Sequence, residues 1–366
     1  ASGNVFDFDD THLGTVIHPT APVAPALFAL AEMRPVSGRN LLLAFALGVE
    51  IECRLGNAIS PEHYTRGWHI TSTCGTLGAA AASGKLLSLD TERTMWAIGA
   101  AATQTGGLVE CLGTPTKSLS VGNAARSGLW SALLAERGFN GPPAPIEGRQ
   151  GYLSALAPST IDWPALTDGL GDTWELAKNT YKPYPCGIVV HPVIDAALAL
   201  RQMPGFALDS IERIIVRGHP LLTARADRPN VTTGREAQVS VQHSVAAALL
   251  FGAASLAQYT DACVRDPAVQ ALRAKITVEP SETIDIAAAT LDVRTRDGAS
   301  RVVNIPAARG SLARPLTDRE IEDKLRALAA SWCASHNIQP VIDAVWVLDR
   351  TDDASLALRL AVPAQT

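Results

Sequence analysis

The spacing of apolar residues changes twice along this chain, and this change constrains the fold more than any other feature of the sequence. From residue 21 to about residue 178, Ala and Leu recur three and four positions apart, which is the periodicity of amphipathic helices. From Tyr181 onward, β-branched and alternating segments are interleaved with helical ones, and the texture is wholly helical again after Pro315. We therefore predict a mainly α-helical protein with an inserted α/β lid, in which both chain ends build the helical domain.

The predicted domain boundaries follow these changes in periodicity. Residues 1–178 and 313–366 form the two parts of the helical domain, and residues 179–312 form the α/β lid. The predicted helices of the first part cover residues 21–32, 39–55, 70–87, 90–103, 123–136 and 163–170. The lid is predicted to hold strands at 211–218, 275–279, 287–295 and 300–305, with helices at 192–202, 241–256 and 266–273. Small residues dominate the helix at 70–87, which permits neighbouring helices to approach closely.

Composition excludes several classes of protein. The net charge of −5 gives no general attraction to nucleic acid or to anionic lipid, since both require clustered Lys and Arg. The longest weakly polar stretch, residues 74–87, carries Lys85 and is too short to span a bilayer. The six cysteines are scattered singly without a CxxC pair or zinc-site spacing, so we expect reduced thiols in a cytoplasmic protein that binds no metal. The N-terminus also lacks the pattern of a signal peptide.

The start of the chain is dense in ionisable groups. Three carboxylates and two imidazoles lie within residues 7–18, and they include Asp7, His12 and His18. These groups can transfer protons near neutral pH, whereas a solvated loop with a helix cap is the alternative. Asp7 to Thr11 also satisfies DxDxT, the nucleophile loop of haloacid-dehalogenase-like phosphatases. That loop normally follows a buried apolar strand, but here Ala-Ser-Gly-Asn-Val precedes it.

Two further candidates lie at predicted helix starts. His69 precedes the helix at 70–87, whose dipole disfavours an imidazolium ion and favours bound anions; a buried core histidine is the alternative. Lys117 lies in the sequence Gly-Thr-Pro-Thr-Lys-Ser, which lacks the second glycine of a phosphate loop. We expect a turn to present Lys117 just ahead of a helix that begins near Val121, whereas the alternative is an exposed surface lysine.

Lys182 lies where the helical texture gives way to the α/β texture. Pro183 and Pro185 stiffen the segment Tyr-Lys-Pro-Tyr-Pro-Cys-Gly around it, and ligands prefer clefts at domain junctions. A rigid linker without a binding role is the alternative. No flanking motif identifies Cys186 as a nucleophile.

Four segments taken together resemble one known family. They read DFDDTHLGTVIHPTAPVAPALFALAE, RGWHITSTCGTLGAAAASGKLL, LGTPTKSLSVGNAARSGL and KPYPCGIVVHPVIDAAL, in that order. This arrangement resembles the MmgE/PrpD family, which includes 2-methylcitrate dehydratase, cis-aconitate decarboxylase and iminodisuccinate epimerase. The resemblance implies a mostly helical domain built from both chain ends, an inserted α/β lid, a homodimer, and a site between the domains that uses neither metal nor cofactor.

The motif matches carry six site residues over to this chain. They are Asp7, Thr11, His18, His69, Lys117 and Lys182. The resemblance implies that the two lysines bind the carboxylates of a small polycarboxylate substrate and that the two histidines transfer protons, in either order. Asp7 would orient an imidazole, and Thr11 would hydrogen-bond a substrate oxygen. We expect these residues to converge on one cleft.

Three departures from the family bear on the reaction. Members usually carry a further segment before the first motif, so we expect this chain to lack helices that support the site in its relatives. The cis-aconitate decarboxylases have a histidine shortly after the lid lysine, where this chain has Gly187. Their lid tyrosine falls in a segment that here contains Arg225 and no tyrosine. Both lid differences count against decarboxylation of cis-aconitate.

The sequence therefore favours a metal-independent hydro-lyase of the 2-methylcitrate dehydratase type acting on a small di- or tricarboxylate. An isomerase or epimerase of the iminodisuccinate epimerase type is the alternative, because it would use the same acid and base on opposite faces of one carbon. A catalytically silent helical dimer and a DxDxT phosphatase are disfavoured.

Overall fold

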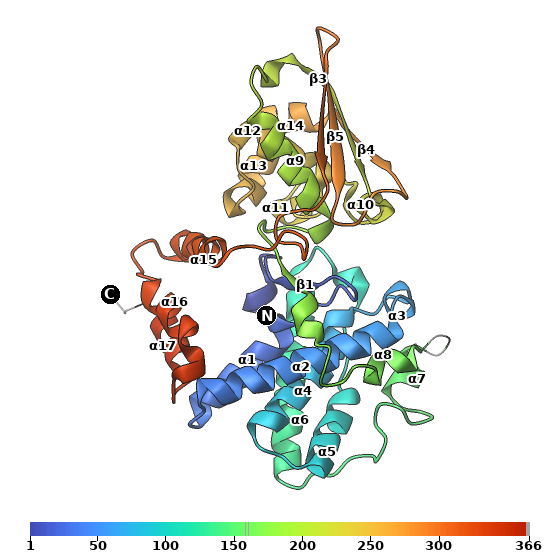
Figure 1. Cartoon of the computed structure of the whole chain (residues 1–366), viewed down its shortest axis with the longest axis vertical. Coiled ribbons are helices and arrows are strands. Elements are labelled where there is room, and N and C mark those ends of the chain that lie inside the picture. The colour runs from blue at the N-terminus through green and yellow to red at the C-terminus, as the bar shows by residue number, and fades with distance from the viewer. Residues whose placement is uncertain (158, 160, 364–366) are drawn as a thin grey trace. The chain divides into compact units, whose positions relative to one another are not determined.

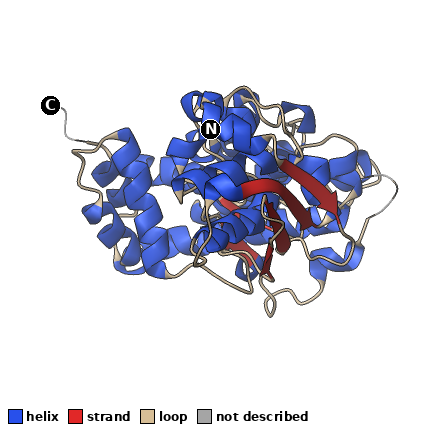
Figure 2. Ribbon diagram, turned by 90° about the horizontal axis from the view of Figure 1, so that it is seen from above, coloured by secondary structure: helices blue, strands red, loops and turns tan. Residues whose placement is uncertain are grey.

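The computed structural model describes residues 1–157, 159 and 161–363, and the chain divides into two compact units (Figure 1). The helical unit comprises residues 1–4, 10–179 and 317–366, as far as these are described. The α/β unit comprises residues 5–9 and 180–316. Helices dominate the chain, and the four longer strands lie together in the α/β unit (Figure 2). The predicted class, mainly α with a small α/β part, is confirmed.

The helical unit is built around one central helix, α4 (Ile70–Leu86), whose residues from Ile70 to Gly84 are all buried. Helices α1, α2, α5 and α6 surround it. The other elements of this unit are β1 (Asp10–His12), α1 (Thr20–Met33), α2 (Gly38–Ile59), α3 (Glu62–Thr65), α5 (Thr91–Ala102), α6 (Pro115–Glu136), α7 (Tyr152–Leu156), α8 (Trp163–Thr167), α15 (Asp318–Trp332), α16 (Gln339–Trp346) and α17 (Leu356–Ala361).

Glycine residues allow the backbones around α4 to approach closely. A Cβ atom on Gly48 of α2 would lie 2.9 Å from the carbonyl oxygen of Gly78, and one on Gly128 of α6 would lie 2.7 Å from that of Thr76. No real Cβ atom tolerates such contacts with backbone. The small-residue stripe of α4 therefore acts as predicted, because it brings α2 and α6 close against the central helix.

The last part of the chain returns to the start of α2. The amide of Gly38 donates to the carbonyl of Thr351 at 2.9 Å, and the amide of Ala354 donates to the carbonyl of Val36 at 2.8 Å. Leu348 and Ala354 join a small apolar core with Val36 and Leu41. Upstream, Thr317 and Glu320 form a reciprocal capping box that fixes the start of α15.

The α/β unit holds a four-stranded sheet in the order β4-β3-β5-β6. Its strands are β3 (Ile211–Gly218), β4 (Ile276–Pro280), β5 (Ala289–Thr295) and β6 (Ser300–Ile305), and only the β3–β4 pair is parallel. Its helices are α9 (His191–Arg201), α10 (Pro220–Ala226), α11 (Gly234–Ala237), α12 (Val241–Phe251), α13 (Asp261–Arg265) and α14 (Pro267–Arg273), and α9 packs on β5 and β6. Strand β2 (Asn179–Tyr181) begins at the last residue of the helical unit.

Two predicted helix boundaries are wrong for identifiable reasons. Helix α12 ends at Phe251 because Gly252 adopts a left-handed conformation, which terminates the helix before Leu256. Helix α6 begins at Pro115 instead of Asn123, since proline at the first helical position has its φ preset and lacks only an N–H that would be unbonded there. Lys117 thus lies in the first turn of a helix and not in a turn ahead of it.

Within the described residues, no helix is both long enough and apolar enough to cross a membrane.

Candidate active site

Lys182 of the α/β unit is a buried cation held by two carboxylates. Its ammonium nitrogen lies 3.2 Å from Oδ1 of Asp7, 3.1 Å from the carbonyl oxygen of Asp7 and 3.9 Å from Oδ1 of Asp9, and its side chain is 1% exposed. Burial alone lowers the pKa of an ammonium group, but the charges of Asp7 and Asp9 outweigh burial and raise the pKa of Lys182. The side chain therefore remains a point charge at neutral pH.

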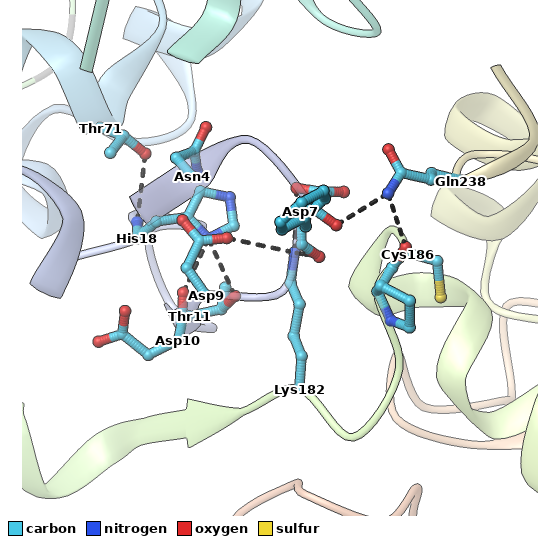
Figure 3. Close-up of polar contacts among 12 residues, drawn as sticks. Asn4, Asp7, Asp9, Asp10, Thr11, His18, Thr71, Lys182, Cys186 and Gln238 are labelled. Carbon is cyan, nitrogen blue, oxygen red and sulfur yellow. Dashed lines mark hydrogen bonds and ion pairs between the residues drawn. The ribbon is translucent and has the colours of Figure 1, made fainter. Parts of the chain in front are cut away.

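Residues 5–9 reach Lys182 because the α/β unit binds their backbone. Gln238 donates from Nε2 to the carbonyl oxygens of Phe6 at 2.8 Å and Pro185 at 3.0 Å, which joins this segment to the loop that follows the lysine (Figure 3). Asp7 itself has a positive φ of 51°, a conformation that Asp tolerates better than most residues. The sequence singled out Asp7 and Lys182 but gave no sign that Gln238 links their segments.

A second clamp holds the loop after Lys182. Asp195 of α9 accepts from the hydroxyl of Tyr184 at 2.6 Å and from the amide of Arg309 at 2.7 Å. The next residue, Gly310, accepts at its carbonyl from the amide of Tyr181 at 3.2 Å. The backbone on both sides of Lys182 is thus fixed by hydrogen bonds, and a binding role for this loop stays a prediction.

In the helical unit, Thr11 and His18 lie together. His18 Nδ1 lies 2.8 Å from the carbonyl oxygen of Asp10 and 3.2 Å from Oγ1 of Thr11, and its amide donates to Oγ1 of Thr71 on α4 (Figure 3). A carbonyl oxygen only accepts, so Nδ1 of His18 carries a hydrogen. In the neutral form of this imidazole the lone pair is therefore on Nε2.

His12, the other imidazole of the first segment, has a structural role. Its Nε2 lies 2.9 Å from Oε2 of Glu175, its Nδ1 lies 2.9 Å from Oγ1 of Thr15, and the ring is buried. Burial lowers the pKa of His12 although Glu175 acts in the opposite direction, so the ring is neutral near pH 7. Both ring nitrogens are engaged in holding β1, and the alternative of a solvated N-terminal loop is wrong for this segment.

His69 and Lys117 are both buried in the helical unit, with exposures of 4% and 6%. His69 is the N-cap residue of α4, as its sequence position predicts, and its Nδ1 lies 2.7 Å from Oγ of Ser72. The alternative of an exposed surface lysine is wrong for Lys117. The structure thus joins Asp7 to Lys182 in one unit and Thr11 to His18 in the other. Convergence of all these residues on one cleft stays a prediction.

Glu52 is a buried acid that sequence reasoning missed. It lies on α2 among Leu, Ile and Cys, and among the described residues neither of its carboxyl oxygens has a hydrogen-bond partner. Gly75 and Gly78 of α4 leave it room, since a Cβ on either would lie 3.1 Å from Oε2. Burial, and then the charge of Asp10, raise the pKa of Glu52 well above its usual value of 4.5, so the group is protonated at neutral pH. An acidic residue inside an otherwise apolar helix face was the available signal.

Comparison with known proteins identifies the family. Residues 1–163 match the MmgE/PrpD N-terminal domain, and residues 184–350 match the MmgE/PrpD C-terminal domain. The chain belongs to the MmgE/PrpD family. Cis-aconitate decarboxylase of Mus musculus is 30% identical over 97% of this chain and 75% of its own length, and that of Homo sapiens is 30% identical over 97% and 76%. The cis-aconitate decarboxylase-like protein oryM of Aspergillus oryzae is 32% identical over 97% and 79%.

In this MmgE/PrpD member, the structure shows what surrounds Gly187 and Arg225, the two lid positions at which the sequence departs from the pattern expected for the decarboxylases. The amide of Gly187 donates to the carbonyl of Gln238 at 2.8 Å, and a Cβ here would meet only ordinary contacts. Arg225 lies in α10, which contains no tyrosine. Two nearby histidines, His191 and His243, are buried in the α/β unit, with Nε2 facing the carbonyls of Cys186 and Gln258 respectively.

Replacing Glu52 by Gln should change how stability depends on pH. In the unfolded chain Glu52 ionises near pH 4.5, whereas the folded chain keeps its proton. The free energy of unfolding of the parent is therefore highest, as far as Glu52 is concerned, below that pH. It falls as the pH rises toward the pKa of Glu52 in the folded chain, because the unfolded chain releases a proton that the folded chain retains. Gln carries no charge at any pH. We expect the difference in Tm between E52Q and the parent to shift in favour of E52Q by several degrees between pH 5 and pH 8.

The matched control is E147Q, which removes the same charge from an exposed position in the helical unit. Thermal unfolding followed by circular dichroism at both pH values should give E147Q and the parent parallel curves. If the Tm difference between E52Q and the parent is the same at pH 5 and pH 8, Glu52 is not held protonated.

Proposed function

We propose that this protein is a lyase that acts on a small di- or tricarboxylate by moving a proton at the carbon next to a carboxylate. The observation that carries the proposal is the pair of built groups in the structure: a buried ammonium ion at Lys182, and an imidazole at His18 whose Nδ1 is bound to backbone. Family membership supports it, because the relatives bear the name of an enzyme that acts on a tricarboxylate.

The proposed chemistry assigns each group a task. Lys117 and Lys182 bind substrate carboxylates as point charges, and a buried cation stabilises the negative charge that develops when the α proton leaves. One imidazole, His18 or His69, takes that proton, and the other protonates the departing hydroxyl group. One C–H bond and one C–O bond break, a C=C bond forms, and water leaves. Thr11 hydrogen-bonds a substrate oxygen, and Asp7 orients an imidazole.

Among the family chemistries, the surroundings of Lys182 support elimination of water over loss of CO₂. Decarboxylation leaves a carbanion that must receive a proton, and the decarboxylases have a histidine and a tyrosine on the lid for such a task. Here those positions offer Gly187 and Arg225, and the rings of His191 and His243 are buried against backbone carbonyls. Losing one aimed donor typically costs on the order of 10²–10³ in rate.

Decarboxylation of cis-aconitate is the second candidate, and the relatives favour it. Two of the three compared proteins carry that enzyme's name and the third is named as a protein like it, and their identity of 30–32% extends over 97% of this chain. Epimerisation is a third outcome, since it needs the same proton removal without loss of a group.

A labelled-solvent experiment separates these reactions. The enzyme is incubated in D₂O with 2-methylcitrate, citrate and cis-aconitate, and products are followed by NMR and CO₂ release. We expect net loss or gain of water, with deuterium entering at the carbon next to a carboxylate, at an ordinary enzyme rate of about 1–10 s⁻¹ on the best substrate.

The other outcomes are equally distinct. Release of CO₂ with formation of itaconate at a comparable rate would identify a decarboxylase, and deuterium entry with inversion but no loss of water would identify an epimerase. No deuterium exchange on any polycarboxylate would refute the proposal. The K182M variant is the control, because it keeps the bulk of the side chain but removes its charge.

We propose that the reaction requires no metal ion. The carboxylates of Asp7 and Asp9 face the ammonium group of Lys182, so a cation from the chain itself offsets part of their negative charge. Turnover should therefore be unchanged after dialysis against EDTA. Loss of turnover that Mg²⁺ restores would contradict this and would revive the DxDxT phosphatase hypothesis, which would then be tested with phosphate esters.

We further propose a homodimer, as the family resemblance implies. Large apolar side chains are exposed on α15 and α16, including Trp332 at 68% and Trp346 at 51%. Burying exposed apolar side chains of this size against a second chain is favourable. Light scattering should give twice the mass of one chain at micromolar concentration. The mass of a single chain would contradict the proposal.

A further inference from the structure

The hydroxyl groups of Ser72 and Ser120 form a relay of hydrogen bonds between the imidazole of His69 and the backbone carbonyl of Lys117. Ser72 lies one turn into α4, and its Oγ is 2.7 Å from Nδ1 of His69. The same Oγ is 2.8 Å from Oγ of Ser120 on α6, and Ser120 in turn lies 2.8 Å from the carbonyl oxygen of Lys117. All four residues belong to the helical unit.

The carbonyl at the end of this relay fixes the direction of every hydrogen bond in it. A carbonyl oxygen only accepts, so Ser120 donates its single hydrogen to the carbonyl oxygen of Lys117. Oγ of Ser120 then accepts a hydrogen bond from Ser72, and this uses the single hydroxyl hydrogen of Ser72. Ser72 must therefore accept from His69, and this bond requires a hydrogen on Nδ1 of the imidazole.

We propose that Ser72 and Ser120 are positioning residues that hold neutral His69 with its hydrogen on Nδ1, so that Nε2 is the atom that exchanges a proton with the substrate. The inference deepens the proposed function and rests on the role in proton transfer assigned there to His69. A neutral imidazole has one donor and one acceptor nitrogen, and the hydrogen bond made by one nitrogen sets the state of the other.

The Ser72 end of the relay is shielded from solvent, whereas Ser120 is partly exposed. Ser72 is fully buried, and a Cβ on the neighbouring Gly107 would lie 3.0 Å from its Oγ. Gly107 has a positive φ of 130° and accepts at its carbonyl from the amide of His69 at 3.0 Å. The chain at residue 107 therefore covers the relay and also holds the histidine backbone.

The other candidate imidazole reaches the same state by a different route. Nδ1 of His18 lies against the carbonyl of Asp10 without a side-chain relay. Both histidines then present Nε2, so each is a base when neutral and an acid when protonated. Because the state of His69 depends on two serine side chains, it is open to change by mutation in a way that the state of His18 is not.

The test is to read the tautomer directly. The protein is labelled with ¹⁵N-histidine, and the signals of His69 are assigned by their disappearance in H69Q. In the parent protein without substrate, at a pH where the ring is neutral, we expect the protonated nitrogen of His69 to be Nδ1. In S120A, Ser72 loses its acceptor and donates to His69 instead, so the hydrogen should move to Nε2.

Turnover is measured on the same samples. A neutral His69 with hydrogen on Nε2 cannot accept a proton there, so kcat of S120A should fall roughly 100-fold, the lower end of the contribution typical of general acid–base catalysis, with little change in KM. The matched control is S83A. Ser83 lies in the same helix, is fully buried, and among the described residues its hydroxyl oxygen has no hydrogen-bond partner. S83A should keep both the parent tautomer and the parent kcat.

The two readouts separate the inference from the proposed function. Hydrogen on Nε2 in the parent, or an unchanged tautomer in S120A, would overturn the relay. If the tautomer switches while kcat stays at the parent value, the relay stands as a structural feature, and the inference that Nε2 exchanges the proton is overturned along with the catalytic role of His69. If no polycarboxylate is turned over even by the parent, the proposed function fails while the NMR measurement still decides the tautomer.

Discussion

Close packing of α4 against its neighbours is the constraint on which the helical unit depends. The backbones of α2 and α6 approach α4 where Gly48 and Gly128 offer no side chain, and the whole of α4 up to Gly84 is buried. One consequence concerns the polar residues at its start. His69 and Ser72 lie at the N-terminal end of a helix with no exposed face, so their hydrogen-bonding groups must find partners within the protein. The same packing places the carboxyl group of Glu52 against Gly75 and Gly78, where it is held neutral.

The electrostatic constraint in the α/β unit is different, because the charged ammonium group of Lys182 is buried there. Removing an ammonium ion from water costs several kcal/mol, and the cost is recovered only when opposite charges and hydrogen bonds lie close. Lys182 has Asp7 and Asp9 for this purpose, and they come from a five-residue segment far from it in sequence. Gln238 and the backbone around Tyr181 hold the two sides of the ion pair in place. The ion pair therefore depends on contacts between two segments that lie far apart in sequence.

Periodicity predicted much of the fold, because it depends on local sequence. Strands β3 and β6 have the predicted bounds, and β4 and β5 differ only at their ends. Boundaries failed where one residue overrides the periodicity, as Pro115 does at the start of α6 and Gly252 at the end of α12. Short strands such as β1 were not predicted, since three residues carry no measurable period. The candidate site residues came from motifs, whereas Ser72, Ser120 and Gln238 act through contacts between segments that no single-sequence pattern reveals.

The arrangement of the imidazoles narrows the chemistry that the helical unit can perform. Elimination of water requires one group that takes a proton and another that gives one, and two histidines that both present Nε2 meet this need when they differ in protonation. The groups around the two rings differ. Glu52 is neutral and contributes no charge, whereas the carboxylate of Asp10 is bound by Thr20 and Asn179, both at 2.6 Å. The backbone carbonyl of that same Asp10 lies 2.8 Å from Nδ1 of His18, while Nδ1 of His69 lies 2.7 Å from the hydroxyl oxygen of Ser72. A carbonyl oxygen can only accept, but a hydroxyl group can donate or accept, so the hydrogen on Nδ1 is fixed by backbone at His18 and by a side chain at His69.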